Sequence, residues 1–153
     1  EVDYDWRATE NFSISGYYAY LHSEIDGLTL NTATGPQDFS GLPLRQAPKH
    51  SYSIVLDYKT PISSGELDFR VQYAFNDDQF NDYPPMTETV IEAAKLLDAS
   101  VSWTSSEGRY QLVLWGKNLT DERYVSHSYR IGPGSVGVWS DPATYGLTAR
   151  MVF

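Results

Sequence analysis

The sequence predicts an all-β protein: an antiparallel up-and-down meander of about seven strands, forming a partial transmembrane β-barrel. Three observations support this fold class. Apolar and polar residues alternate with a period of two through most of the chain, and no stretch has a convincing helical period. Connections of a few residues alternate with connections of more than about 15 residues. Aromatic residues make up 14% of the 153 residues, and several lie near the predicted strand ends.

Seven segments carry the alternation, and turn-forming residues separate them. The predicted strands are Val2–Ala8, Phe12–Glu24, His50–Tyr58, Glu66–Phe75, Leu96–Thr104, Tyr110–Asn118 and Ala143–Phe153. In the fourth strand one face holds Leu67, Phe69, Val71, Tyr73 and Phe75, and the other holds Asp68, Arg70, Gln72 and Ala74. This pattern predicts a sheet but not its surroundings, because a lipid-facing wall and a half-exposed soluble sheet share it.

The lengths of the connections indicate the topology. The short connections, which suit hairpin turns, are Thr9–Asn11, Lys59–Gly65 and Ser105–Arg109. The long ones are Ile25–Lys49, Asn76–Ala94 and Leu119–Pro142, with one helical turn expected near Thr89–Ala94. In a meander, alternate connections fall at opposite ends, so all long loops should lie at one end. Transmembrane barrels have this arrangement, with short periplasmic turns and long extracellular loops.

The composition excludes several classes of function. Twenty acidic residues against 11 basic ones give a net charge of −9, so no nucleic-acid partner is expected. Cysteine is absent, which removes disulfides, thiolate metal sites and cysteine nucleophiles. No window of about 18 apolar residues could form a transmembrane helix. A barrel strand needs only about 9–11 alternating residues, so a membrane location stays open.

The residues that could carry catalysis are scattered. His22, His50 and His127 lie on different segments without metal-binding spacing, and no G-x-S-x-G motif is present. We therefore predict no catalytic residues, no cofactor and no enzyme activity. The acidic loop Asn76–Asp82 holds three aspartates, but it lacks the ligand order of a calcium loop. A solvated acidic loop is the expectation there, with a cation site as the alternative.

Two segments near the C-terminus resemble a known family. Leu112–Tyr124 reads LVLWGKNLTDERY, and it resembles the penultimate-strand signature of TonB-dependent outer-membrane receptors. In that family a strand ends in an Asn-Leu-Thr/Phe-Asp-Glu/Lys-x-Tyr motif. The motif residues here are Asn118, Leu119, Thr120, Asp121, Glu122 and Tyr124. Because Asn and Asp bond to nearby backbone groups and stabilise turns, we interpret this motif as a structural strand terminator. Ala47–Ser51, before the third strand, resembles a recurring strand entry of the same family.

The last strand carries the second resemblance. Tyr145, Leu147, Ala149, Met151 and Phe153 alternate on one face and end in an aromatic residue. This pattern resembles the terminal strand of bacterial outer-membrane proteins, which the barrel-assembly machinery recognises. Strand addition to an exposed edge, with alternating side chains for specificity, gives that recognition its physical basis.

The resemblance implies a transport function. A TonB-dependent receptor has an N-terminal plug and a 22-stranded barrel in the bacterial outer membrane, and it takes up a scarce nutrient such as a ferric siderophore, cobalamin or an oligosaccharide. Residues 1–153 would be the C-terminal segment of that barrel, without the plug or the earlier strands. The implied partners are outer-membrane lipid, the rest of the barrel and its plug, the TonB complex and the barrel-assembly machinery. The third long loop would face outward, and its ligand-contact candidates are His127, Tyr129, Arg130 and Trp139.

One alternative belongs to another class of protein. A soluble β-sandwich that binds carbohydrate through surface Tyr and Trp would have the same composition and alternation. The two hypotheses differ in what covers the apolar face, which is lipid in the first and a second sheet in the other. If the segment is isolated, the first hypothesis also predicts self-association, because open sheet edges pair with other chains.

Overall fold

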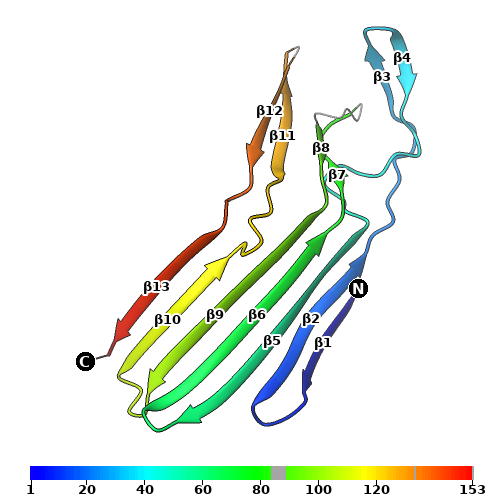
Figure 1. Ribbon diagram of the computed structural model, residues 1–153. Coiled ribbons are helices and arrows are strands. Elements are labelled where there is room, and N and C mark those ends of the chain that lie inside the picture. Colours follow the sequence, from blue (N-terminus) through cyan, green and yellow to red (C-terminus); the bar gives the residue numbers. More distant parts are fainter. Residues whose placement is uncertain (84–88, 133, 153) are drawn as a thin grey trace.

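The structure is a computed structural model, and it describes residues 1–83, 89–132 and 134–152. Its main element is one seven-stranded antiparallel sheet in the order β1-β2-β5-β6-β9-β10-β13. These strands are β1 (Val2–Arg7), β2 (Phe12–Tyr20), β5 (His50–Ile62), β6 (Gly65–Asn76), β9 (Ala94–Ser105), β10 (Tyr110–Lys117) and β13 (Thr144–Met151). Each pairs with the next large strand along the chain, which confirms the predicted seven-stranded meander (Figure 1).

The three long connections are partly ordered as small hairpins. They contain the two-stranded pairs β3 (Thr29–Thr32) with β4 (Gly35–Asp38), β7 (Gln79–Phe80) with β8 (Val90–Ile91), and β11 (Val125–Ile131) with β12 (Gly134–Trp139). All three lie at one end of the sheet, and the short turns lie at the other (Figure 1). The helical turn expected near Thr89–Ala94 is wrong at Val90–Ile91, because that pair is extended and bonds to Gln79–Phe80.

Two strand boundaries differ from the prediction by four residues, and the others differ by two residues at most. β2 ends at Tyr20 rather than Glu24, and β5 continues to Ile62 rather than ending at Tyr58. Pro61 marked the expected turn, yet it lies within β5, opposite Glu66 of β6. β2 begins only at Phe12, opposite Tyr58, so the last part of β5 has a neighbour on one side alone. A proline is tolerated there because an edge position does not require its missing N–H.

Short polar contacts hold the turns at the other end. The Thr9 hydroxyl accepts hydrogen bonds from the backbone N–H groups of Asn11 at 3.2 Å and Phe12 at 3.0 Å. Gly108 has a φ of 69° and donates its N–H to the Ser105 carbonyl at 2.8 Å. A non-glycine residue rarely adopts that φ, so this glycine permits the tight turn between β9 and β10.

The strand register sorts the side chains onto two faces. On β5 and β6 the pairs Tyr52–Phe75, Ile54–Tyr73, Leu56–Val71 and Tyr58–Phe69 lie on one face, which we call the apolar face. Between them lie the pairs Ser53–Ala74, Val55–Gln72, Asp57–Arg70 and Lys59–Asp68, on what we call the polar face. The register places every acidic residue of the seven strands on the polar face: Asp3, Asp5, Asp57, Glu66, Asp68 and Asp98.

Ion pairs cross neighbouring strands on the polar face. Arg70 Nη1 lies 3.0 and 3.1 Å from the two carboxylate oxygens of Asp57. One pair further along the strands, Lys59 Nζ lies 3.3 Å from Asp68 Oδ2. Directly opposed charges of unlike sign each contribute a fraction of a kcal/mol to strand pairing. They also fix the register, because a slip of one residue would move these charges to the apolar face.

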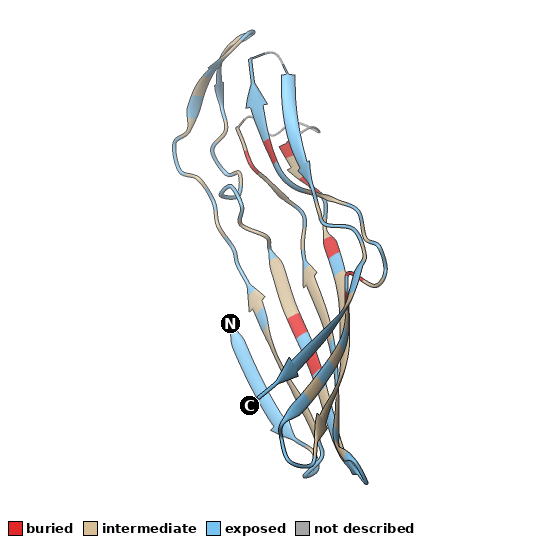
Figure 2. Ribbon diagram, turned by 90° about the vertical axis from the view of Figure 1, so that its left-hand side faces the viewer, coloured by how far each residue is buried: buried red, intermediate tan, exposed pale blue. Residues whose placement is uncertain are grey.

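The sheet is a single layer with almost no core. Among the described residues, only three hydrophobic side chains are buried: Val55, Ile91 and Ala94. On the apolar face Leu114 is 60% exposed and Leu147 is 70% exposed. The edge-on view shows one curved layer with no second sheet against it (Figure 2). The structure therefore favours a piece of barrel wall over the two-layer sandwich, and its barrel is open between β1 and β13.

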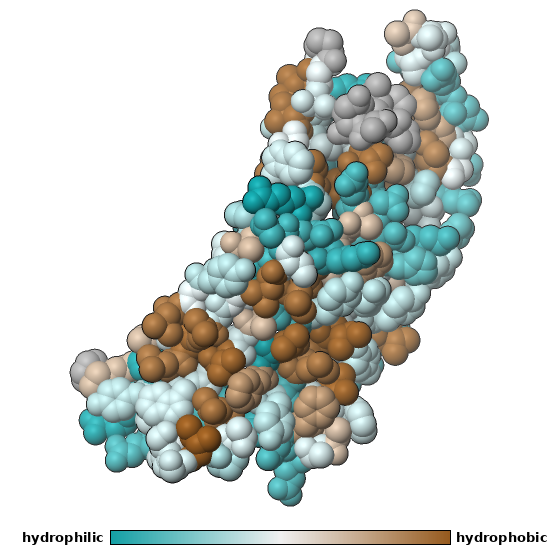
Figure 3. Space-filling view, in the orientation of Figure 1, coloured by the Kyte–Doolittle hydropathy of each residue, from teal (hydrophilic) through white to brown (hydrophobic). Residues whose placement is uncertain are grey.

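Aromatic side chains border an aliphatic band on the apolar face. Tyr18, Tyr20, Tyr52, Tyr73 and Phe75 lie toward the loop end, and Phe12, Tyr58, Phe69, Trp103 and Tyr110 lie toward the turn end. Figure 3 shows hydrophobic residues gathered over the lower part of the strands and a belt of hydrophilic residues above them, where the strands lead into the loops. The 13 residues of β5 span about 40 Å. At the usual barrel tilt that length crosses an apolar band about 25 Å tall. Within the described ranges, no helix is long and apolar enough to cross a membrane.

Candidate functional site

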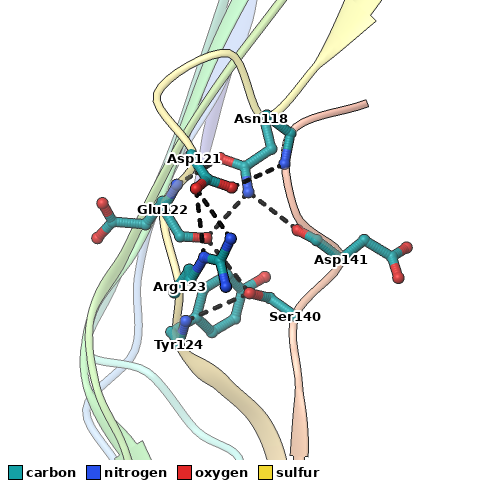
Figure 4. A network of polar contacts seen from close by, with 8 residues as sticks. Asn118, Asp121, Glu122, Arg123, Tyr124, Ser140 and Asp141 are labelled. Atoms are coloured by element: carbon teal, nitrogen blue, oxygen red, sulfur yellow. Dashed lines mark hydrogen bonds and ion pairs between the residues drawn. The ribbon is translucent and has the colours of Figure 1, made fainter. Parts of the chain in front are cut away.

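Asn118 organises the point where β10 leaves the sheet. Its side chain is buried, and its φ is 49°, a left-handed conformation that asparagine tolerates better than most residues. Asn118 Oδ1 accepts the N–H of Glu122 at 2.9 Å. Its Nδ2 donates to the carbonyls of Glu122 at 2.9 Å and Asp141 at 3.0 Å. One amide therefore ties the end of β10 to the segment that leads into β13 (Figure 4).

Asp121 and Ser140 complete this network, which we call the Asn118 bracket. Asp121 accepts the N–H of Ala143 at 3.0 Å and two hydrogen bonds from the Arg123 guanidinium, at 3.1 and 3.2 Å. The hydrogen bond from Ala143, helped by Arg123, lowers the pKa of the Asp121 carboxyl below its ordinary value. Ser140 Oγ accepts the Tyr124 N–H at 3.2 Å, at the base of the β11–β12 hairpin. The bracket therefore orients that hairpin relative to the sheet.

Hydrogen bonds also join the three long loops. The Gln46 N–H donates to the Phe80 carbonyl at 3.0 Å, and the Tyr83 hydroxyl donates to the Pro43 carbonyl. These contacts connect the first loop to the second. Asn81 Nδ2 donates to the Ser128 carbonyl at 2.8 Å, which connects the second loop to β11. The loops thus form one linked cap over the end of the sheet.

A cavity of about 510 Å³ lies where these loops meet, and we call it the loop cavity. The first two loops supply Arg45, Gln46, Asn81 and Asp82 to its lining. The remaining lining residues are His127, Ser128, Tyr129 and Arg130, from β11. Its volume lies within the range of about 300–1,000 Å³ that small-molecule sites have. It holds two guanidinium groups, one carboxylate and one imidazole.

Three of the four predicted contact residues line this cavity, and the fourth does not. His127, Tyr129 and Arg130 line it together, and the His127 and Tyr129 rings lie 5.9 Å apart between centroids. Trp139 is outside the lining; it pairs with Val125 at the base of the hairpin and is 67% exposed. The register of the hairpin shifts between Val125 and His127, so Trp139 pairs with Val125 rather than with Ser126.

Five lining residues escaped the sequence analysis: Arg45, Gln46, Asn81, Asp82 and Ser128. Four of them come from loops without periodicity, where no sequence pattern indicates which residues converge. Ser128 is one of many serines in the chain, and nothing in the sequence distinguishes it from the others. The only binding site that the sequence of the acidic loop Asn76–Asp82 indicated was a cation site. Its carboxylates bond locally instead, with Asp77 accepting the Asp78 N–H and Asp82 the Tyr83 N–H.

Two other hollows lie nearby. One of about 350 Å³ separates the first two loops and is lined in part by Leu21, Leu44 and Phe80. Another of about 150 Å³ lies on the polar face, between Arg70, Asp98, Trp115 and Lys117. In the part of the chain that the structure describes, no three His, Asp or Glu side chains gather in a metal-binding arrangement.

The last strand lies at the edge of the sheet. Tyr145, Leu147, Ala149 and Met151 lie on the apolar face, opposite Gly116, Leu114, Leu112 and Tyr110 of β10. Tyr145 is 67% exposed. Phe153, the predicted terminal aromatic of the assembly signal, lies outside the described residues.

The chain is similar to a known family of receptors in both sequence and structure. The family model for the TonB dependent receptor-like β-barrel matches residues 1–119. The structure resembles the ferric yersiniabactin uptake receptor FyuA from Yersinia pestis, with a TM-score of 0.79 and 18% identity, over 99% of this chain and 22% of that chain. It also resembles the siderophore receptor PiuA from Acinetobacter baumannii, with a TM-score of 0.75 and 18% identity, over 95% of this chain and 20% of that chain.

The chain thus spans about a fifth of the length of each of these two receptors. No curated protein matches the chain. The match to the family model covers the strands β1 to β10, and the two structural likenesses extend the same fold through β13. On this basis, the chain belongs to the family of TonB-dependent receptor β-barrels.

Proposed function

We propose that residues 1–153 form the C-terminal part of the barrel of an outer-membrane TonB-dependent receptor that takes up a ferric siderophore. Cobalamin and oligosaccharides are the other substrate classes that the family resemblance offers. The likeness to FyuA, a ferric yersiniabactin uptake receptor, and to PiuA, a siderophore receptor, favours the first class. The observation that carries the membrane role is the apolar face, which has no carboxylate in seven strands and aromatic residues at both borders.

In this proposal the two faces have different partners. The apolar face contacts outer-membrane lipid, where an unpaired charge would be costly. The polar face, with Arg70, Asp98 and Lys117, lines the lumen and contacts the plug. Edge strands β1 and β13 pair with the remaining strands of the barrel, because bare edges in a membrane would leave backbone groups without hydrogen bonds. The TonB complex acts through the N-terminal part, and the chain itself carries out no catalysis.

The last strand has a second role in this proposal. Its apolar-face residues Tyr145, Leu147, Ala149 and Met151, followed by Phe153, present the pattern that the barrel-assembly machinery reads. Strand addition is possible there because β13 has a hydrogen-bonding neighbour, β10, on one side only within the described sheet.

Growth on iron chelates tests the proposed function. The full-length gene is expressed in a bacterial host that lacks its own iron-chelate receptors, and growth is measured with ferric chelates as the only iron source. The expected result is growth on at least one chelate, and loss of that growth when TonB is deleted. Recovery of the protein from the inner membrane or the soluble fraction, or growth that persists without TonB, would refute the proposal.

A further inference from the structure

One lysine lies on the apolar face. Within the seven strands, all of which the structure describes, Lys95 is the only lysine or arginine that the register places there. Lys95 is exposed and pairs with Phe75 of β6, and directly opposed residues of an antiparallel pair share a face. The Phe75 ring in turn stacks on Tyr52, with 5.0 Å between the ring centroids. Lys95 therefore lies at the loop-end border of the apolar face, level with the aromatic residues there.

Lys95 ends a row of side chains that crosses four strands. Tyr18 of β2 lies opposite Tyr52 of β5, and Tyr52 lies opposite Phe75. Lys95, on the far side of Phe75, completes the row. The Lys95 ammonium acts electrostatically on the Tyr52 hydroxyl, which also interacts with the hydroxyl of Tyr73. One ammonium and two hydroxyl groups, all of them hydrogen-bond donors, therefore gather at one point of the border.

No carboxylate of the described residues pairs with the Lys95 ammonium. The other cations within the middle strands do have such partners, because Lys59 pairs with Asp68 and Arg70 with Asp57 on the polar face. Every acidic residue of the seven strands lies on that polar face, which the sheet itself separates from Lys95. The counter-charge for Lys95 must therefore come from outside this part of the chain.

The depth of Lys95 in the wall suits the headgroup layer of a membrane. A charge on the lipid face of a barrel is costly at the bilayer midplane and tolerated near the interface. The lysine stem can lie along apolar neighbours while its ammonium reaches the headgroups. The turn-end border has aromatic residues but no lysine or arginine from the seven strands. The positive charge thus belongs to one leaflet only, the one at the long loops.

We propose that Lys95, with the hydroxyls of Tyr52 and Tyr73, binds the phosphate of an anionic membrane lipid in the outer leaflet. The ammonium and a hydroxyl donate charge-assisted hydrogen bonds to the phosphate oxygens. The acyl chains lie along the aliphatic band beneath, where Ile54 is 39% exposed and Leu56 is 37% exposed. This inference rests on the membrane role proposed for the apolar face and does not depend on the substrate that the receptor transports.

The test compares two lipids with the same acyl chains on the full-length protein in detergent micelles. Dioleoyl phosphatidylglycerol is anionic, whereas dioleoyl phosphatidylcholine carries a phosphate but no net charge. The amount of each lipid that stays bound is measured by native mass spectrometry. The expected result is preferential retention of the anionic lipid, because a lysine at the membrane surface is attracted to anionic headgroups. Equal retention of the two lipids would overturn the inference.

Substitutions of lysine locate the preference at Lys95. Lys95→Gln should lower the preference for the anionic lipid by about fivefold, and Lys95→Arg, which keeps the charge, should retain it. The matched control is Lys59→Gln, which removes the same charge from the polar face, where Lys59 pairs with Asp68. An equal loss in Lys95→Gln and Lys59→Gln would show that only net charge matters, and it would overturn the inference.

A second pair of variants tests the hydroxyl groups. Tyr52→Phe removes one hydroxyl and keeps the ring that stacks on Phe75, so the wall should not be weakened. Retention of the anionic lipid should fall by about two- to fivefold because a donor to the phosphate is lost. Tyr58→Phe makes the same change on the same strand at the turn-end border, and retention should stay unchanged there. Equal retention by the two variants would overturn the assignment of the tyrosine hydroxyls to the site.

Inorganic phosphate distinguishes a lipid site from a site for soluble anions. At the same concentration as the lipid, it should not displace the lipid, because it has no acyl chains to place on the apolar face. Displacement would overturn the inference. The two proposals can also fail separately. A receptor that supports growth on a ferric chelate but shows no lipid preference would lose only the Lys95 site, whereas a full-length protein that stays soluble without detergent would refute the membrane role itself.

Discussion

The phenol ring of Tyr4 lies across Gly16, and its hydroxyl donates a hydrogen bond to the Ser53 carbonyl at 3.3 Å. Tyr4 is on β1, Gly16 is opposite it on β2, and Ser53 is on the next strand, β5. A Cβ added at Gly16 would lie 2.6 Å from the Tyr4 hydroxyl oxygen and 2.0 Å from the Ser53 carbonyl oxygen. The glycine therefore gives the tyrosine room to tie the edge strand β1 across β2 to β5.

Gly16→Ala should weaken this edge of the barrel. The added methyl group cannot be accommodated without moving backbone atoms of β5, and overpacking of this kind costs about 1–3 kcal/mol. The free energy of unfolding of the full-length protein, measured by urea titration in detergent micelles, should fall by that amount. Gly134→Ala is the control, since a Cβ there would lie 3.9 Å from the Ile131 carbonyl oxygen. Equal unfolding midpoints for the two variants would contradict the role assigned to Gly16.

Leu56→Arg tests whether the apolar face meets lipid. Leu56 lies in the aliphatic band between Tyr52 and Tyr58 and is 37% exposed. An arginine at the bilayer midplane of a barrel costs about 2–4 kcal/mol. The variant should therefore assemble poorly in lipid vesicles, as measured by the fraction that resists protease. Ser102→Arg places the same charge on the polar face, opposite Asp68, and should assemble normally. A similar loss in both variants would argue against a lipid-facing wall.

Asn118→Ala should release the base of the β11–β12 hairpin. The substitution leaves the Glu122 N–H and the Asp141 carbonyl without their side-chain partner, at a cost of about 1–3 kcal/mol. It also places alanine at a positive φ, which adds strain. Hydrogen exchange should accelerate in residues 118–143. Thr120→Ala, at an exposed position in the same turn, is the control and should leave the exchange rates unchanged.

The pH dependence of the Asn118 bracket follows from the lowered pKa of Asp121. An aspartate in the unfolded chain has a pKa of about 3.9. Because the pKa of folded Asp121 lies below that value, ionisation of its carboxyl group stabilises the folded state. This contribution to the free energy of unfolding is fully present at pH values above about 3.9. That contribution is lost as the pH falls through the folded pKa. The difference in stability between the wild type and Asp121→Asn should therefore shrink as the pH falls below about 3.9. A difference that stays constant through the acid unfolding range would contradict this assignment.

The isolated segment should self-associate. Within the described sheet, β1 and β13 each have one bonded neighbour, and the apolar face has no cover. Bare strand edges pair with other chains. Residues 1–153 alone, refolded in detergent, should give oligomers by light scattering after gel filtration. A monodisperse monomer that unfolds cooperatively would contradict this expectation and would favour the alternative of a soluble, self-contained β-sandwich.

Local pattern determined most of the sheet. Alternation identified all seven strands and their apolar faces, because a pleated strand directs successive side chains to opposite sides. Connection lengths then gave the meander. The end of β5 was not predicted correctly, because proline usually indicates a turn. Only the structure shows that β2 does not extend alongside Pro61, so that the strand can continue through it. The pairs β3–β4 and β7–β8 were missed because strands of four and two residues are too short to show a period. The β11–β12 hairpin was missed although β11, with seven residues, does alternate.

The sequence by itself determined the wall: seven strands, one apolar face, and the Asn118 motif at the end of β10. The loop cavity was decided only by the tertiary structure. His127, Tyr129 and Arg130 could be proposed from one segment, but Arg45 and Asn81 come from loops tens of residues away along the chain. Their convergence depends on single long-range contacts such as the Asn81 hydrogen bond to Ser128, and a contact of that kind leaves no periodic trace in a sequence.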